Sequence, residues 1–113
     1  MGNHPSVDLM AWSPAEVPFG VDVKGLYRRN YWLVSAKAPK LNLFYVFAFV
    51  PDVGANRFFV LTQDQVNNEL AADLDRARER AFAKGRMISD EDFTGVSWPA
   101  AEKYEDAWRI LPA

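Results

Sequence analysis

Two carboxylates and a lysine lie at spacings that could hold a metal ion beside a phosphate group. Asp22 and Lys24 are two positions apart in a strand-like segment, so we expect their side chains to project from one face, about 6.6 Å apart along the strand. Asp8 lies in the preceding strand-like segment, and the intervening turn would bring the two segments side by side. The spacing therefore predicts that the carboxylates of Asp8 and Asp22 meet at one cation.

Such an arrangement is suited to the hydrolysis of a phosphodiester. A hard divalent ion such as Mg²⁺, or Mn²⁺ in its place, is commonly held by one or two carboxylates together with water and substrate phosphate. The ion polarises the phosphate and lowers the pKa of a bound water, while a nearby lysine orients that water or stabilises the developing charge. We predict Asp8 and Asp22 as metal ligands and Lys24 as the water-positioning cation. From the residues alone, the alternative is a solvated face of an edge strand.

A basic segment follows this motif and could contact a polyanion. Between residues 22 and 40 there are five Lys or Arg residues and one Asp. Arg28 and Arg29 lie in a predicted loop, where arginines can bind a DNA backbone bidentately. Ser35 and Lys37 share one face of a predicted strand and could line the phosphate path. We expect a nucleic acid, in the first place DNA, as the partner; the alternative is a solvated turn and a polar strand end.

The segments around these residues have the pattern of a sheet followed by a helix. Strand-like patterns cover residues 7–12, 19–25, 31–36, 43–50 and 57–61. Residues 43–50 are apolar on both faces, which predicts the middle strand of the sheet. Thr62-Gln63-Asp64-Gln65 has the form of a capping box, so a helix is predicted over 63–84, with Gly85 as its C-terminal stop. The sequence therefore predicts an α/β (α+β) fold, with a central mixed sheet of about five strands and a long helix after the last strand.

Beyond residue 85 the sequence predicts less regular structure. Residues 100–111 have the pattern of a short helix or a docking tail that packs through its aromatic residues. The long helix carries a polar face of mixed sign, which we interpret as a solubilising surface. Its members are Asp73, Asp75, Arg76, Arg78, Glu79 and Arg80.

The chain resembles the PD-(D/E)xK nuclease superfamily. In that superfamily an Asp on one strand precedes a (D/E)xK on the next, and Val7-Asp8-Leu9-Met10 followed by Val21-Asp22-Val23-Lys24-Gly25 looks like this split motif. Residues 31–37, 42–47 and 57–62 are similar to segments of small uncharacterised bacterial endonuclease-like proteins. The resemblance covers nearly the whole chain. It implies a restriction-endonuclease-like core and a magnesium-dependent endonuclease; the alternative is a non-catalytic member that binds nucleic acid or protein.

The sequence departs from that pattern mainly at its beginning. The superfamily usually opens with a helix before the first metal-binding strand, whereas only seven residues precede Asp8. We therefore expect a single domain, residues 1–113, that lacks this helix and could be truncated at its N-terminus. An uncovered sheet face should then be covered by the segment around Trp98, Tyr104 and Trp108, or by a second copy in a homodimer.

Composition narrows the class of protein. The net charge is −2. There is no cysteine, and this absence excludes a disulfide framework and a thiolate zinc site. It is also compatible with the cytoplasm, where we expect the protein. The longest apolar run has eight residues, against roughly 20 for a membrane-spanning helix. His4 is the only histidine, so a histidine-based triad is not expected.

Overall fold

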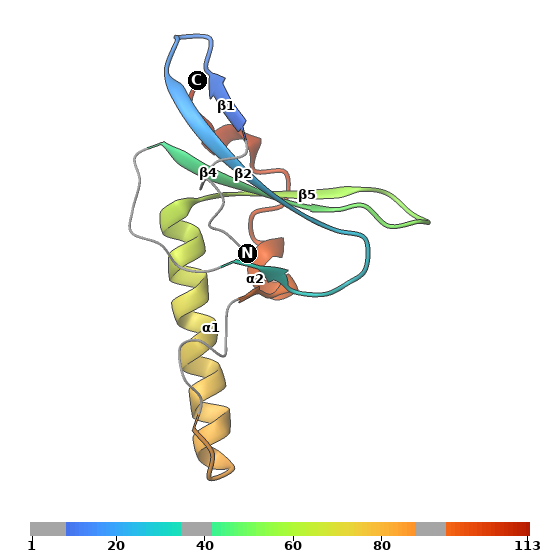
Figure 1. The fold of residues 1–113 in the computed structure, drawn as a ribbon, viewed down its shortest axis with the longest axis vertical. Coiled ribbons are helices and arrows are strands. Elements are labelled where there is room, and N and C mark those ends of the chain that lie inside the picture. Colours follow the sequence, from blue (N-terminus) through green and yellow to red (C-terminus); the bar gives the residue numbers. More distant parts are fainter. Residues whose placement is uncertain (1–8, 35–41, 88–94) are drawn as a thin grey trace, which may run out of the picture.

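The computed structural model describes residues 9–34, 42–87 and 95–113 and shows an α+β fold (Figure 1). In these residues the main sheet contains four strands: β1 (Leu9–Trp12), β2 (Pro18–Leu26), β4 (Leu43–Phe49) and β5 (Arg57–Thr62). The other elements are the long helix α1 (Gln63–Ala83), the short strands β3 (Trp32–Leu33) and β6 (Gly95–Val96), the short helix α2 (Trp98–Glu102) and the 3-10 helix η2 (Trp108–Ile110).

The main sheet is mixed and has the strand order β1-β2-β4-β5. Strands β1 and β2 form the predicted hairpin, with Leu9 opposite Val21. Its turn is closed by Ser13, whose backbone N–H donates to the Val17 carbonyl at 2.9 Å and whose hydroxyl accepts from the Val17 N–H at 3.0 Å. Strand β2 pairs with β4 in parallel, and β4 pairs with β5 antiparallel. The predicted mixed sheet with an interior β4 is therefore confirmed.

Alternating residues of β4 supply two cores on opposite faces of the sheet. Leu43, Tyr45 and Phe47 project toward α1 and α2 and belong to the larger core. Phe44 projects the other way and packs with Phe19 in a smaller cluster. Figure 1 shows α1 and α2 below β4 and β5, and the C-terminal end beside the β1–β2 hairpin. A strand that is apolar on both faces is thus covered on both faces, as its sequence predicts.

Trp32 anchors β3 on the larger core and explains why β3 does not join the main sheet. Its side chain is fully buried and stacks on Phe47 with ring centroids 5.5 Å apart. Its indole N–H donates to the Ala48 carbonyl at 3.1 Å. The sequence predicts residues 31–36 as the third of five strands in the central sheet, but β3 is two residues long and pairs with β6 instead. Trp32 and Leu33 lie over the sheet face, where the tryptophan ring packs on Phe47.

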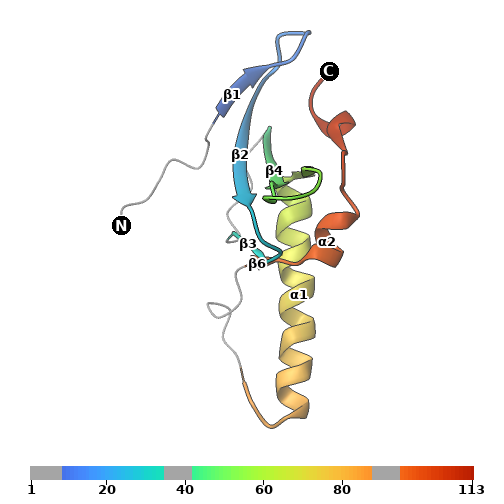
Figure 2. The same ribbon diagram turned by 90° about the vertical axis from the view of Figure 1, so that its right-hand side faces the viewer.

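Helix α1 begins and ends where the sequence predicts. The Thr62 hydroxyl accepts from the Gln65 N–H at 3.1 Å, and the Gln65 side-chain oxygen accepts from the Thr62 N–H at 2.9 Å, which completes the capping box. Gly85 ends the helix in the left-handed region, with φ of 73°. The first turns pack on the core through Val66 and Leu70, whereas the last turns extend beyond the sheet (Figure 2).

The C-terminal segment covers part of both sheet faces. Trp98 is buried in the larger core, and Ile110 packs against the smaller cluster on the other face. Arg57 of β5 holds this segment through a bidentate ion pair with Glu105, with both nitrogen–oxygen distances at 2.8 Å. The C-terminal segment therefore covers the sheet as expected. Coverage by a second copy of the chain in a homodimer stays a prediction.

We predict that Trp32→Ala destabilises the protein strongly. The substitution removes a fully buried indole and its hydrogen bond, so the free energy of unfolding should fall by roughly 3–5 kcal/mol in urea denaturation. Leu33→Ala is the matched control, because the adjacent Leu33 side chain is 74% exposed and its removal should change the free energy by about 0.5 kcal/mol or less. Equal losses for the two variants would contradict the anchoring role of Trp32.

Candidate functional site

Asp22 and Lys24 lie together on β2, on the face that carries the larger core. Lys24 Nζ is 3.2 Å from Asp22 Oδ1, so the predicted sharing of one strand face is confirmed. Asp22 is only 3% exposed, and β2 is an interior strand between β1 and β4. The alternative of a solvated edge-strand face is therefore wrong for Asp22. A carboxylate this buried needs a compensating cation, and Lys24 provides it.

Tyr45 and Gln63 complete a polar cluster around the carboxylate, here called the Asp22 cluster (Asp22, Lys24, Tyr45 and Gln63). The parallel ladder places Tyr45 opposite Asp22, and Gln63 is the first residue of α1. Burial raises the pKa of the Tyr45 hydroxyl, the negative charge of Asp22 raises it further, and a side-chain hydrogen bond with Gln63 partly offsets these effects. Both residues are buried. The cluster therefore joins β2, β4 and the start of α1.

Sequence reasoning did not find Tyr45 and Gln63. Tyr45 lies in the apolar run of residues 43–50, which predicts the middle strand, and Gln63 is predicted only as the beginning of the helix. Their proximity to Asp22 depends on the parallel pairing of β2 with β4, which connects residues more than 20 positions apart. The one available signal was a polar hydroxyl inside an otherwise apolar strand.

The oxygen atoms of the Asp22 cluster are of the kinds that bind a hard cation. A carboxylate, an amide oxygen and a hydroxyl are oxygen ligands, which Mg²⁺ and Mn²⁺ accept. Within residues 9–34, 42–87 and 95–113, no group of three or more His, Cys, Asp or Glu side chains is placed to hold a metal ion. Asp8, the second predicted ligand, lies outside the described residues, so the meeting of Asp8 with Asp22 stays a prediction.

Lys24 borders an open cavity of about 340 Å³ beside β2, here called the Lys24 groove. It is lined by Val23, Lys24, Gly25, Leu26, Asn30, Tyr31, Trp32 and Leu33. The lysine therefore stands between a buried carboxylate and a space that a ligand could enter. This is the position required of a group that acts on a bound phosphate or water.

Of the four predicted substrate-binding residues, the structure describes Arg28 and Arg29. Arg28 and Arg29 are exposed in the connection between β2 and β3. The Arg29 guanidinium lies 3.9 Å from the centroid of the Trp98 ring, a cation–π contact that holds the connection against α2. Arg29 thus has a packing role, and binding of phosphate by either arginine stays a prediction. Ser35 and Lys37 lie outside the described residues.

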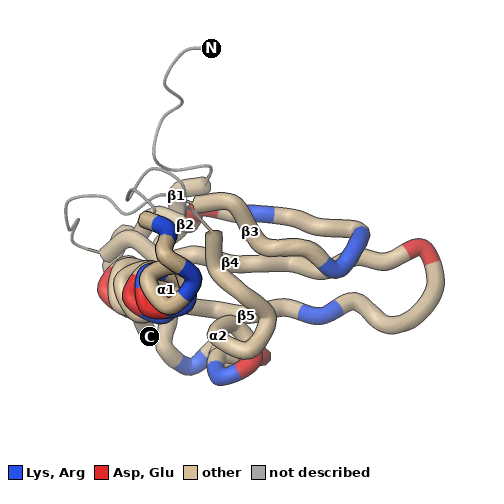
Figure 3. Tube along the Cα trace, turned by 90° about the horizontal axis from the view of Figure 1, so that it is seen from below, with Lys and Arg blue, Asp and Glu red and all other residues tan. Residues whose placement is uncertain are grey.

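A second polar site lies between α1 and α2 and is here called the α1–α2 cleft. It has a volume of about 470 Å³. It is lined by Tyr31, Glu69, Asp73, Arg76, Arg80, Ser97, Trp98, Pro99, Ala100 and Lys103. Figure 3 shows α1 nearly end on, with basic and acidic positions around it. Two of the acids on this helix, Glu69 and Asp73, are buried, so the interpretation of the polar face as a solubilising surface is wrong for Asp73.

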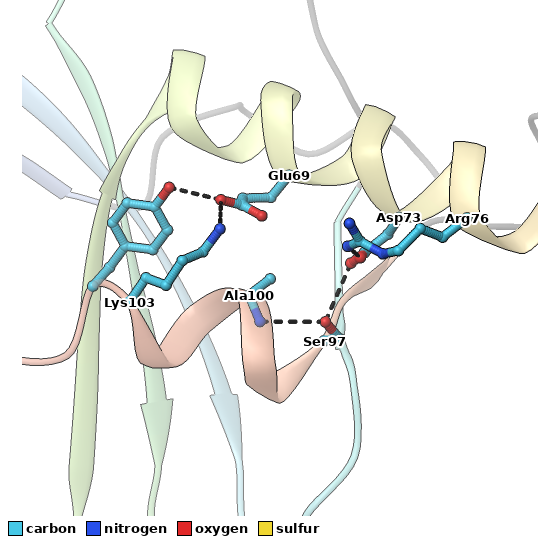
Figure 4. Close-up of polar contacts among 7 residues, drawn as sticks. Glu69, Asp73, Arg76, Ser97, Ala100 and Lys103 are labelled. Carbon is cyan, nitrogen blue, oxygen red and sulfur yellow. Dashed lines mark hydrogen bonds and ion pairs between the residues drawn. The ribbon is translucent and has the colours of Figure 1, made fainter.

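Glu69 joins α1 to the segment after α2 (Figure 4). One of its carboxylate oxygens accepts from Lys103 Nζ at 2.5 Å and from the Tyr104 hydroxyl at 2.7 Å. Burial alone would raise the pKa of Glu69, but the hydrogen bonds from Lys103 and Tyr104 outweigh it, and the pKa lies below its ordinary value. Burial and the Glu69 carboxylate together raise the pKa of Tyr104 to about 12. The carboxylate is therefore held ionised.

Asp73 makes the equivalent link one helical turn further along α1. It pairs with Arg76 on the same helix and accepts from the Ser97 hydroxyl at 3.2 Å (Figure 4). Ser97 also caps α2, since its hydroxyl oxygen accepts from the Ala100 N–H at 3.4 Å. The two buried acids thus dock α2 on α1 and hold two cations at the cleft.

No family model, curated protein or solved structure matches this chain. The resemblance to the PD-(D/E)xK superfamily therefore stays a prediction from the motifs. Within the described ranges, none of the helices is both long and apolar enough to span a bilayer.

We predict that Glu69 makes stability sensitive to acid. Because its folded pKa lies below the ordinary 4.5, its stabilising contribution is complete above that value and is lost as pH falls through the folded pKa. The free energy of unfolding, measured in urea at a series of pH values from neutral to acidic, should fall less steeply below 4.5 for Glu69→Gln than for the wild type. Glu79→Gln, at an exposed acid of the same helix, should follow the wild type. Identical profiles for all three proteins would contradict this role of Glu69.

Proposed function

We propose that this chain is a magnesium-dependent nuclease that hydrolyses phosphodiester bonds in DNA, with Asp22 as a metal ligand and Lys24 as the water-positioning cation. The observation that carries the proposal is the Asp22–Lys24 pair. A buried carboxylate and a partly exposed ammonium group lie 3.2 Å apart where β2 borders the Lys24 groove. Such a pair offers a hard oxygen ligand and a positive charge to the same bound phosphate.

The surroundings of the pair support preorganisation. Asp22 and Lys24 are fixed by hydrogen-bonded pairing on a strand that has neighbours on both sides, rather than on a loop. The Asp22 carboxylate holds the lysine ammonium at the groove, so little reorganisation is needed when negative charge develops on a phosphate oxygen. Tyr45, which lies opposite Asp22 on β4, and its hydrogen-bond partner Gln63 are both buried. The protein thus contributes fixed charge and orientation.

The second carboxylate of the proposed site is Asp8. In the sequence it directly precedes Leu9, and Leu9 pairs with Val21, the neighbour of Asp22. When bound, Mg²⁺ would supply Lewis-acid activation of the phosphate and a more acidic water. Asp22, with Asp8, would hold the ion, and Lys24 would orient the attacking water toward the phosphorus. The D-x-K spacing and the resemblance to the PD-(D/E)xK superfamily support the same assignment.

A non-catalytic protein of the same fold that binds nucleic acid or protein is the second candidate. The observation that favours it is the burial of Asp22, whose charge Lys24 already compensates. In that case the pair would serve the stability of β2. The two candidates differ in metal-dependent cleavage, which only the nuclease performs.

We predict that Lys24→Ala abolishes Mg²⁺-dependent nicking of plasmid DNA, with a loss on the order of 10²-fold or more. Asp22→Asn should weaken metal affinity, so that added Mg²⁺ restores part of its activity, while Lys24→Ala stays inactive at every Mg²⁺ concentration. Lys84→Ala is the control, because Lys84 is an exposed lysine at the end of α1, away from the Asp22 cluster. Gel assays of nicking over a Mg²⁺ series separate the three variants.

The Lys24 variant requires a check of folding, because its removal leaves the buried Asp22 carboxylate without this ion pair. We expect a loss of about 1–3 kcal/mol in the free energy of unfolding, larger than for an ordinary surface change. The double variant Asp22→Asn, Lys24→Met removes both charges and should recover much of that stability while remaining inactive. If the wild type cleaves neither single- nor double-stranded DNA nor RNA with Mg²⁺ or Mn²⁺, the nuclease proposal fails and the binding protein takes its place.

A further inference from the structure

The α1–α2 cleft and the Lys24 groove are neighbouring cavities that share one wall. Tyr31 lines both of them. Tyr31 is 44% exposed, so a ligand can contact part of this residue. The two cavities therefore adjoin at Tyr31.

The charges of the cleft are arranged to attract an anion. Its acids, Glu69 and Asp73, are buried and paired with Lys103 and Arg76, which compensate their negative charge. The side chains of those two cations remain 58% and 55% exposed, which leaves donors for a ligand. Arg80 also lines the cleft, and it forms no ion pair with the residues that the structure describes. The open surface of the cleft therefore carries more available positive than negative charge.

The size of the two cavities favours a single strand. Their volumes, about 340 and 470 Å³, lie within the range of roughly 300–1,000 Å³ that holds a small organic ligand. Each can take a unit of a single chain, whereas a paired duplex presents a much wider surface. Cationic grooves combined with exposed aromatic rings are the usual means of binding single-stranded nucleic acid, with the backbone in the groove and a base on the ring.

We propose that the α1–α2 cleft binds the phosphodiester backbone of a single nucleic-acid strand that continues from the Asp22–Lys24 pair, with Tyr31 stacking on a base between the two sites. This inference rests on the proposed nuclease function, and it assigns that function a substrate with a single-stranded segment. Arg80, Arg76 and Lys103 contact the phosphates. Glu69 and Asp73 act as positioning residues, because they hold two of these cations at the cleft.

Binding of a fluorescein-labelled oligodeoxythymidine, measured by anisotropy in EDTA over a series of salt concentrations, tests the cleft without cleavage. Arg80→Ala should weaken binding and reduce the slope of log affinity against log salt by about 0.7, the value for one lost phosphate contact on a single strand. Arg80→Lys should keep the slope. Tyr31→Ala should weaken binding about fivefold or more, with little change in slope, since stacking carries no net charge. The labelled strand annealed to its complement should bind more weakly than the free strand.

Arg80 is the residue to change because its removal breaks no buried ion pair among the described residues, so loss of folding does not confuse the result. Arg109→Ala is the matched control: Arg109 is exposed on η2, next to Ile110, which packs on the opposite face of the sheet. It should bind like the wild type. Poly-glutamate, a polyanion without bases, should compete poorly.

Three results would overturn the strand site: no binding of the oligonucleotide, equal affinity of the wild type and both the Arg80→Ala and Tyr31→Ala variants, or competition by poly-glutamate at matched charge. These outcomes are distinct from failure of the nuclease proposal. If the protein cleaves DNA with Mg²⁺ but Arg80→Ala binds the strand as tightly as the wild type, the strand-site proposal fails and the nuclease proposal stands. If the strand binds in an Arg80-dependent way but no divalent ion supports cleavage, the strand-site proposal stands and the nuclease proposal fails.

Discussion

The parallel pairing of β2 with β4 is the constraint on which the rest of the structure depends. Two parallel strands cannot be joined by a tight turn, so the chain between Leu26 and Leu43 must leave the end of one strand and return to the start of the other. In the described part of this connection Trp32 packs on Phe47, over the sheet face. The same ladder aligns Asp22 with Tyr45. The core, the short strand β3 and the polar cluster thus have one common origin.

Buried acids recur in this small domain, and each is matched with a cation. Asp22 is paired with Lys24, Glu69 with Lys103, and Asp73 with Arg76. Because an ionised carboxylate is costly to bury alone, each cation compensates the charge of the acid that it pairs with. The Glu69 contacts connect α1 to the segment after α2, and the Asp22 pair lies within β2. The first pair therefore links two elements, whereas the second lies within one strand.

What could be predicted from the sequence was local. The hairpin, the capping box at Thr62 and the common face of Asp22 and Lys24 all follow from alternation, turn residues and spacing over a few positions. The pairing of β3 with β6 could not be predicted in that way. A strand-like pattern does not reveal whether the segment joins the edge of the main sheet or packs its aromatic residue on the sheet face. The nuclease function, its metal ion and its nucleic-acid partner stay predictions.

Residues of the site that sequence reasoning missed depend on long-range contacts. Tyr45 and Gln63 acquire their roles only when β2 lies beside β4 and α1 starts at the same level. Asp73 has the pattern of a surface residue until Ser97, 24 positions later, donates to it. Asp8, Ser35 and Lys37 lie outside the described residues, so their contribution to the site stays a prediction. Periodicity along one segment cannot supply such information, since it describes the faces of an element and not their neighbours.

The C-terminal segment has a further consequence, for self-association. The backbone N–H of Val60 donates to the Tyr104 carbonyl at 3.1 Å, and that of Asp106 donates to the Phe58 carbonyl at 2.9 Å. These bonds occupy backbone groups along the outer edge of β5, where unpaired groups would otherwise act as a template for another strand. The ion pairs of Arg57 with Glu105 hold the blocking segment in register. A strand from a second molecule, in a dimer or in an aggregate, would therefore find this edge of the sheet already occupied.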